Sequence, residues 1–506
     1  MKIAIIGAGV SGLSVGCYLQ MNGFETEIYE KNIHPGGLCA SWKRGDFTFD
    51  GCLHWVMGSG SGSPFYGLWN ELIDMPSVGF VNHDVRMDVE LAVNSDRHGD
   101  KVFHLYTNID RLESYMLDNA PEDASLIKGL TGVMRTMQRY EMPPMLDNIP
   151  ELQPLRKKMA MITYLPMVWQ YLKWKNETNL TFARKLSNPF LKEAFELLYD
   201  GDEQKLLILT MPLSVFDKKS AGYPIGGSLK FISHIATRYS SLGGKIHYNS
   251  PVKRIVTHES AAKGLILNNG TEVQADLVIS AADWHHTVFE ALEGKYINRK
   301  ILDLATNTKP KVYPSVFMVL LGVNKTYNEQ PHLIKFPIET PVLSPDGNEY
   351  RRMELHFYHY DPDLAPKGKT VIAASLYTNN GEYWINLRAG DYDQYIKSKT
   401  QFAEHILDQL DRKVPGLRQS VEVMDVVTPA TYHRYTNNWM GSVQGWMPGK
   451  DLLAASPVDM ELPGLSGFYF CGHWTAPGGG LPPSLKSSRD LAQRICIKHK
   501  KHFVIR

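Results

Sequence analysis

Cysteine is scarce in this sequence. The 506 residues include five cysteines, and no two of them form a Cys-X-X-Cys pair or stand at the spacing of a zinc site. An odd, low number of cysteines argues against a disulfide framework and is typical of a reducing compartment. A signal peptide is not expected, because a glycine-rich fingerprint already begins at residue 7. We therefore expect a cytoplasmic protein.

Long apolar runs and an excess of one charge are also absent. No stretch of about 18 consecutive apolar residues occurs, so no transmembrane helix is expected. Lysine and arginine number 54 against 53 aspartate and glutamate, which gives a formal net charge of +1. This balance creates no global field that would attract nucleic acid, and we expect no nucleic-acid partner. The length is enough for two or three lobes, and no internal repeat stands out.

The first twelve residues carry the strongest signal. A short apolar run at residues 1–6 leads directly into Gly7-Ala8-Gly9-Val10-Ser11-Gly12. In a dinucleotide-binding βαβ unit the first glycine permits a sharp turn and the second lets a pyrophosphate approach the backbone. The third glycine lets the helix pack closely on the strand. The N-terminus of that helix offers free N–H groups and its positive dipole end to the phosphates.

The residues that follow fit a dinucleotide site. A helical stretch at residues 13–22 and an apolar run at residues 24–29 lead to Glu30, eighteen residues beyond Gly12. A carboxylate at this place accepts hydrogen bonds from both hydroxyls of an adenosine ribose and repels a 2′-phosphate. The fingerprint occurs once, whereas separate folds for a flavin and a nicotinamide would each carry one. We therefore predict one tightly bound FAD and no stable complex with NADH or NADPH.

The rest of the chain alternates between helical and strand-like patterns, which indicates interleaved lobes. Strands are predicted at residues 245–248, 252–257, 264–267, 271–273, 316–323, 370–377 and 468–471, and helices at residues 228–242 and 395–410 and from Ser484 onward. Residues 110–200 also look helical. We expect an FAD-binding domain built from residues 1–75, 221–290 and 441–506, and a substrate domain built from residues 76–220, with a helical lid, and 291–440.

Several blocks in family order resemble the flavin amine oxidase/phytoene desaturase superfamily. The resemblance is closest to the branch that holds carotenoid desaturases, carotenoid isomerases and retinol saturases. The blocks are Pro35-Gly36-Gly37, Asp50-Gly51 with His54-Trp55, Tyr223-Pro224-Ile225-Gly226-Gly227, Ser280-Ala281-Ala282-Asp283, and Gly472-His473-Trp474-Thr475 leading to Leu481-Pro482. The resemblance implies an α/β fold with a Rossmann-like FAD-binding domain of the glutathione-reductase-2 type and an interleaved α+β substrate domain.

The fingerprint and the resemblance together give a set of expected FAD-binding residues. That set is Gly7, Ala8, Gly9, Ser11, Gly12, Glu30, Lys31, Gly36, Gly37, Leu38, His54, Val252, Gly472, Leu481 and Pro482. Two departures affect its details. Leu38 stands where many relatives have an arginine, and His473 stands where many flavoproteins have an acid.

No catalytic residue is assigned by the sequence. His54, Trp55 and Trp474 are candidates, because the resemblance places them near the flavin or the substrate cavity. Flavin chemistry needs placement of the cofactor more than a protein nucleophile. We expect no metal site, since the adjacent pair His285-His286 has no evident carboxylate or cysteine partner.

Residues 159–175 interleave methionine, tyrosine and tryptophan with terminal lysines around Pro166. This pattern suits an interfacial helix that dips into lipid and admits an apolar substrate, and it also fits the plainer interpretation of an ordinary lid helix packed on the substrate lobe. Both interpretations, and peripheral membrane contact with them, stay open.

The leading hypothesis is an FAD-dependent oxidoreductase that acts on C–C bonds of an apolar polyene or isoprenoid-like lipid, by desaturation, saturation or isomerisation. One alternative is an amine oxidase, which needs an aromatic cage and usually a lysine beside the flavin. The other is a non-catalytic prenyl-lipid chaperone of the same fold. The intact fingerprint and Glu30 argue against the chaperone.

Overall fold

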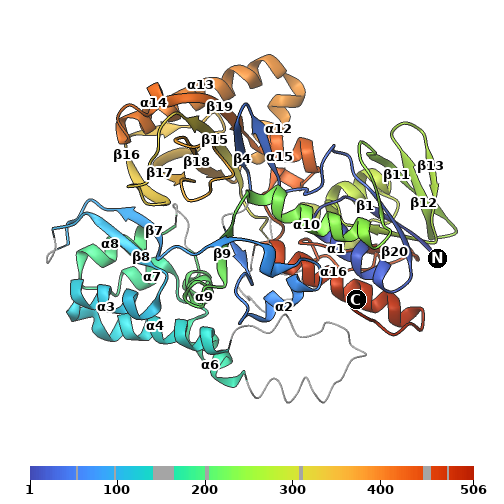
Figure 1. Cartoon of the computed structure of the whole chain (residues 1–506), viewed down its shortest axis with the longest axis horizontal. Helices are drawn as coiled ribbons and strands as arrows, with labels where there is room; N and C mark the ends of the chain where they lie inside the picture. Colours follow the sequence, from blue (N-terminus) through green and yellow to red (C-terminus); the bar gives the residue numbers. More distant parts are fainter. Residues whose placement is uncertain are drawn as a thin grey trace.

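A five-stranded parallel sheet lies at the end of the molecule where both chain termini are found (Figure 1). The computed structural model describes residues 1–52, 55–95, 99–140, 164–199, 204–306, 311–447, 457–475 and 478–506. The sheet has the order β10-β2-β1-β14-β20, with β1 at Lys2–Ile6, β2 at Glu25–Tyr29, β10 at Lys245–His247, β14 at Leu277–Ser280 and β20 at Phe468–Phe470. Strands from the beginning, middle and end of the chain therefore build one sheet.

The two faces of this sheet are covered differently, because alternate residues of β1 point to opposite sides. Ile3 and Ile5 share a buried cluster with three helices, while Ala4 belongs to a cluster with a small antiparallel sheet. The helices are α1 (Val10–Met21), α10 (Gly227–Ser241) and α16 (Leu481–Lys498), and the antiparallel strands are β11 (Val252–His258), β12 (Ala261–Leu267) and β13 (Glu272–Gln274).

A seven-stranded sheet forms the second lobe, with the order β19-β15-β18-β17-β16-β7-β8. Its strands are β7 (Val85–Glu90), β8 (Val102–Tyr106), β15 (Ser315–Val323), β16 (Leu333–Leu343), β17 (Glu349–Phe357), β18 (Thr370–Thr378) and β19 (Val421–Val427). All nine residues of β15 are buried. Phe317 and Val319 pack with α12 (Gly381–Gly390) and α13 (Tyr392–Lys413), whereas Val316 and Met318 face the hairpin of β3 (Ser41–Arg44) and β4 (Phe47–Asp50).

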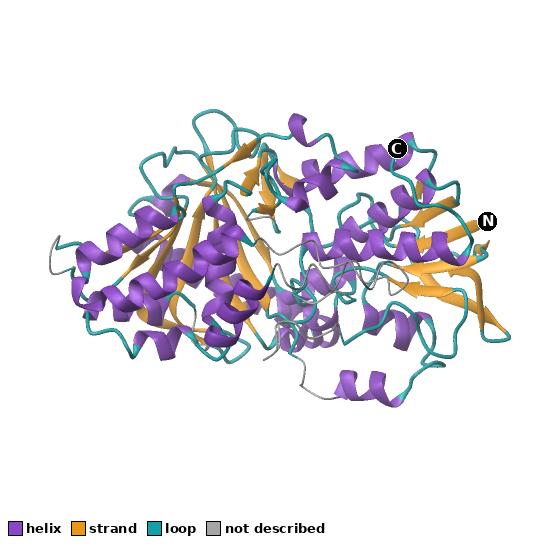
Figure 2. Cartoon of the chain, turned by 90° about the horizontal axis from the view of Figure 1, so that it is seen from below, coloured by secondary structure: helices purple, strands orange, loops and turns teal. Residues whose placement is uncertain are grey.

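Helices pack against β7 and β8, at one edge of this sheet (Figure 1), and Figure 2 shows the molecule from below. They are α3 (Ile109–Asn119), α4 (Ala124–Arg139), α6 (Leu165–Trp174), α7 (Asn179–Ala183), α8 (Pro189–Leu197) and α9 (Leu206–Asp217). Pro166 stands in the first turn of α6, where its missing N–H costs nothing. In the described residues no helix is both long and apolar enough to cross a membrane.

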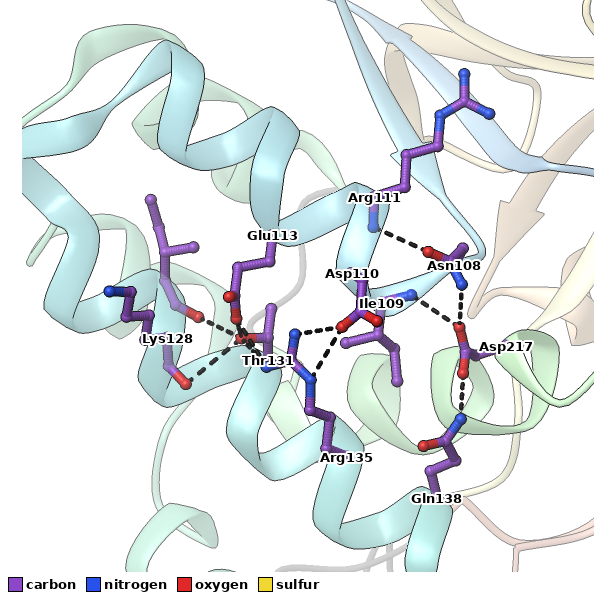
Figure 3. A network of polar contacts seen from close by, with 11 residues as sticks. Asn108, Ile109, Asp110, Arg111, Glu113, Lys128, Thr131, Arg135, Gln138 and Asp217 are labelled. Carbon is purple, nitrogen blue, oxygen red and sulfur yellow. Dashed lines mark hydrogen bonds and ion pairs between the residues drawn. The ribbon is translucent and has the colours of Figure 1, made fainter.

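A polar network ties α9 to α3 and α4 (Figure 3). Asp217, at the end of α9, accepts hydrogen bonds from the Asn108 side chain at 2.8 Å and from the Ile109 N–H at 2.9 Å, and Gln138 of α4 donates to its other oxygen. Arg135 of α4 bridges to Asp110 of α3 at 2.6 Å. These contacts fix the helices that line the cavity described below.

The short elements expected from the sequence agree with the structure to within a few residues. The strands expected at residues 264–267 and 271–273 correspond to β12 and β13, which pair in antiparallel fashion. Strands β16 and β17 fall within residues 310–380, where the sequence shows strand-like alternation. Strands β7, β8 and β19 and the β3–β4 hairpin were not expected, although β7 alternates apolar and polar residues.

Candidate functional site

One cavity of about 1670 Å³ extends from the parallel sheet into the helical group. This volume exceeds the roughly 300–1,000 Å³ of an ordinary small-molecule site, so the cavity has room for a dinucleotide and a second ligand. Its lining draws on both lobes. One part comes from the loops at the carboxyl ends of β1, β2 and β14, which is where ligands bind in open α/β sheets. The other part comes from α4, α6, α9 and β15.

The glycine fingerprint lies in this cavity wall. Gly7 has a φ of +94°, which a side chain would strain, and the chain turns there from β1 into α1. Gly9 caps α1 without any side-chain hydrogen bond, so the first N–H groups of the helix stay open to a ligand. Gly9 also pairs with Gly36, whose N–H donates to the Ala8 carbonyl at 2.9 Å. A Cβ on Gly12 would lie 1.9 Å from the Gly7 oxygen, so Gly12 serves packing.

Glu30 lines the cavity directly after β2 and is 4% exposed. Its carboxylate accepts the Ala8 N–H at 2.7 Å with one oxygen, and the Asn32 N–H at 2.8 Å with the other. These bonds hold one oxygen against the fingerprint loop and the other against the segment after β2, and a ribose hydroxyl would share their remaining lone pairs. Lys31 also lines the cavity, but its amine donates to the Arg434 carbonyl at 2.8 Å and to Asn437 at 2.6 Å.

A second helix N-terminus faces the same cavity. Gly480 caps α16 without a side-chain hydrogen bond, and Leu481 and Pro482 line the wall beside it. His473 lines the wall too, and burial lowers its pKa to about 4, so the imidazole is neutral. Its Nε2 atom is buried without a hydrogen-bond partner in the protein. A bound FAD would supply hydrogen-bond partners to these groups. Its phosphate or flavin oxygens suit the two helix N-termini, and a polar atom of FAD would satisfy the buried Nε2 of His473.

Most of the other expected residues also line the cavity. Gly36, Gly37, Leu38 and Val252 do so, and Val252 is the first residue of β11. Trp55 lines it with its ring centroid 5.2 Å from that of Phe216. His54 lies outside the described residues.

Four of the expected residues are not among the described residues that line the cavity: Ala8, Gly12, Gly472 and Trp474. Trp474 does not face the cavity: its indole is 3% exposed, packs against Trp446 at 5.1 Å between ring centroids, and donates to Asn438 at 3.1 Å. Gly472 also lies behind the lining. A Cβ there would lie 2.9 Å from the Ser11 hydroxyl, and its N–H donates to Ser487 at 2.9 Å, so it lets α1 and α16 approach each other. Sequence alone could not separate these positions from His473, because all three lie in a turn after β20, where no regular period sets the direction of each side chain.

The cavity lining also includes Asp283, His286 and Lys486, which are not among the expected FAD-binding residues. Asp283 is buried after β14 and accepts the N–H groups of His286 at 2.7 Å and Trp439 at 2.9 Å. Burial raises the pKa of Asp283 to about 7, and burial lowers the pKa of His286 to about 4. Lys486 of α16 is 3% exposed and pairs with Asp490 one turn further on. In the described residues no group of three or more potential ligands could hold a metal ion.

The part of the cavity formed by α4, α6, α9 and β15 is apolar. Its lining includes Met137, Met167, Tyr171, Met211 and Val316, and none of the described residues contributed by these four elements carries a charge. Nearby, burial raises the pKa of Tyr313 to about 12 and also raises that of Tyr199, so both phenols stay protonated at neutral pH. This part suits an uncharged apolar ligand.

Replacing Glu30 tests the ribose contact. We expect Glu30→Gln to weaken FAD binding about ten- to a hundredfold, because charge-assisted hydrogen bonds worth roughly 1.5–3 kcal/mol are lost. The amide also turns an N–H group toward the Ala8 or Asn32 N–H. Fluorescence titration of the flavin-free protein with FAD measures the change. An unchanged dissociation constant would mean that Glu30 does not contact the ribose.

Comparison with known proteins adds to this geometry. A family model described as flavin-containing amine oxidoreductase matches residues 10–496. A 4,4'-diapophytoene desaturase from Methylomonas is 24% identical over 99% of this chain and 96% of its own. A chloroplastic prolycopene isomerase from Daucus carota is 24% identical over 97% of this chain and 79% of its own. Among solved structures, an oxidoreductase from Methanosarcina mazei superposes with a TM-score of 0.57 at 18% identity, covering 97% of this chain and 100% of its own.

Proposed function

This chain belongs to the flavin-containing amine oxidoreductases and is an FAD-dependent oxidoreductase, and we propose that it acts on C–C bonds of an apolar polyene or isoprenoid-like lipid. The reaction is a desaturation, saturation or isomerisation of a carotenoid- or retinoid-type substrate. The observation that carries the proposal is the uncharged lining that α4, α6, α9 and β15 add to the cavity containing the dinucleotide fingerprint.

In this proposal one group of residues holds the cofactor and another surrounds the lipid. When bound, FAD accepts or donates the hydride. The N-termini of α1 and α16 and Glu30 hold the cofactor against one side of the cavity. Met137, Met211 and Val316 surround the lipid and exclude water, which favours placement of an apolar chain next to the cofactor.

An amine oxidase is the alternative within the same family. Its substrate carries an amine, which is costly to place among uncharged side chains without a polar partner. Lys486 lines the cavity, but it pairs with Asp490 on its own helix. The apolar lining therefore favours the polyene over the amine. A non-catalytic lipid chaperone is not proposed, because the chain belongs to an oxidoreductase family.

The reaction itself is tested with the purified flavoprotein and a carotenoid or retinoid supplied in liposomes. We expect a change in the visible spectrum of the polyene under anaerobic conditions, with oxidised flavin for desaturation and with reduced flavin for saturation or isomerisation. A panel of primary amines serves as the comparison. Reduction of the flavin by amines and none of these polyene changes would assign the chain to the alternative.

The electron partner is predicted from the single fingerprint. Because no second dinucleotide fold was found in the sequence, we expect NADPH and NADH to reduce the bound flavin slowly and without saturation. A carrier, oxygen or a quinone exchanges the electrons instead. Anaerobic stopped-flow absorbance measures the rate. Saturable reduction at micromolar NADPH would contradict this prediction.

We also propose that α6 contacts a membrane and admits the substrate. Met167, Val168 and Tyr171 line the cavity, while Leu165, Trp169 and Leu172 are 58%, 61% and 55% exposed. One face of this helix thus meets the cavity and another presents apolar side chains to the outside. Lys173 lies over the Trp169 ring at 5.5 Å, so a cation accompanies the exposed apolar side chains, a combination that suits a membrane interface.

Replacing the exposed residues of α6 separates a membrane helix from an ordinary lid. We expect Trp169→Ser with Leu172→Ser to weaken binding to phospholipid vesicles at least about tenfold, since burying one such side chain contributes roughly 1.5–3 kcal/mol. FAD content should not change. Leu343→Ser is the matched control, because Leu343 is 67% exposed on β16. Vesicle co-sedimentation measures binding, and equal loss in both variants would refute a specific role of α6.

A further inference from the structure

Two cysteines face each other at the open end of the β3–β4 hairpin. The last strand pair of the hairpin joins Ser41 to Asp50. The ladder continues beyond it, because the Gly51 N–H donates to the Ala40 carbonyl at 3.1 Å. Cys39 and Cys52 lie just beyond the two strands, and extending this register by one more residue places them opposite each other at a non-hydrogen-bonded position. At such positions the Cα atoms are about 4.5 Å apart, within the roughly 4.4–6.8 Å that a disulfide spans.

Both cysteines line the cofactor cavity, and both are free thiols. Cys39 follows the Gly36-Gly37 segment and is 2% exposed, while Cys52 is partly exposed. The Cys39 thiol donates to the Ser228 carbonyl at 3.9 Å. Asp50 accepts the Cys52 N–H at 2.9 Å and the Ser228 hydroxyl at 2.7 Å. These shared contacts hold the two residues on one rigid corner beside α10.

The surroundings give the two thiols different reactivity. Burial raises the pKa of Cys39, and the Cys52 thiol and the Asp50 carboxylate raise it further. Cys39 therefore remains protonated at neutral pH and is a poor nucleophile. Cys52 is more accessible from the cavity, which makes it the attacking sulfur.

We propose that Cys39 and Cys52 form a redox-active dithiol that exchanges two electrons with FAD bound in the same cavity. Two S–H bonds break and one S–S bond forms, and the two electrons and two protons reduce FAD to FADH₂. An external dithiol reopens the disulfide by thiol–disulfide exchange and restores the pair. This route supplies electrons to the flavin without a nicotinamide. The competing account is that the two side chains only pack against each other.

The first test is disulfide formation in the flavin-free protein. After oxidation with diamide, we expect non-reducing peptide mapping to find Cys39 linked to Cys52, with Cys17, Cys471 and Cys496 free. A mixture of pairings, or two unlinked cysteines at 39 and 52, overturns the proposal. This readout does not depend on activity of the enzyme.

The second test measures electron exchange with the flavin in the holoenzyme. Under anaerobic conditions with dithiothreitol, we expect the wild-type flavin to be reduced at least tenfold faster than in Cys52→Ser or Cys39→Ser. Cys496→Ser is the matched control, since Cys496 is buried in α16, is not among the described lining residues, and should leave the rate unchanged. Cys52→Ser alone decides the matter if Cys39→Ser loses flavin, because Cys52 is only partly buried.

Counting electrons completes this second test. Titration of the oxidised wild type with dithionite should consume four electrons per flavin, because the flavin and the disulfide take two each. Either cysteine variant should consume two. Equal dithiothreitol rates, or two electrons in the wild type, overturn the proposal.

Discussion

A Gly9→Val variant is expected to fold and to be purified colourless, without FAD. Gly9 has a φ of −72° and a ψ of 178°, which valine adopts readily. A Cβ at Gly9 meets only the Gly36 oxygen at 3.7 Å and the Gly37 Cα at 4.0 Å, both ordinary contacts. The empty site therefore tolerates the side chain. A pyrophosphate that must approach the backbone at Gly9 does not, so the loss falls on the cofactor.

Gly12→Val is the contrasting variant. Its Cβ would lie 1.9 Å from the Gly7 oxygen, so α1 cannot pack on the sheet and the protein should fail to fold. The ratio of flavin to protein absorbance measures cofactor content, and circular dichroism with thermal melting measures folding. A folded Gly9→Val protein with a full complement of FAD would show that the pyrophosphate does not pass this residue.

Filling the apolar part of the cavity is expected to abolish most turnover while FAD remains bound. Met211 lines this part from α9 and is only half-buried, so a larger side chain extends into the space for the substrate. We expect Met211→Trp to lower turnover of the lipid roughly 100-fold. Extra atoms in a packed site cost about 1–3 kcal/mol, and the upper end of that range corresponds to this factor. The fingerprint loop is contributed by other elements, so the flavin spectrum should not change.

Met211→Leu is the volume-conserving control and should retain most of the activity. Steady-state turnover with the lipid in liposomes, together with flavin content, distinguishes the two effects. Wild-type turnover in Met211→Trp would place the substrate elsewhere. Loss of flavin would instead mean that the cofactor extends between α9 and β15.

The sequence by itself determined the features that depend on short-range geometry. Gly7, Gly9, Gly12 and Glu30 lie within one βαβ unit, whose turn, helix and second strand are fixed by local spacing. The expected strand at residues 468–471 was equally readable from its apolar run, and the one at residues 252–257 from its β-branched residues. The family resemblance implied that these distant segments belong to one FAD-binding domain.

Only the tertiary structure decided which side chains of distant segments meet. His473 in the cavity wall and Trp474 in the core lie in a turn after β20, where no helix or strand period sets the direction of a side chain, so only the packing of this turn separates them. The two faces of α6 could not be separated before its packing against the cavity was known. Cys39 and Cys52 are thirteen residues apart, and they become opposite only because the β3–β4 hairpin sets its register through Ser41 and Asp50. Strand register and the direction of each side chain follow from pairing and packing across the whole fold, so they are properties of the folded chain and not of its local sequence.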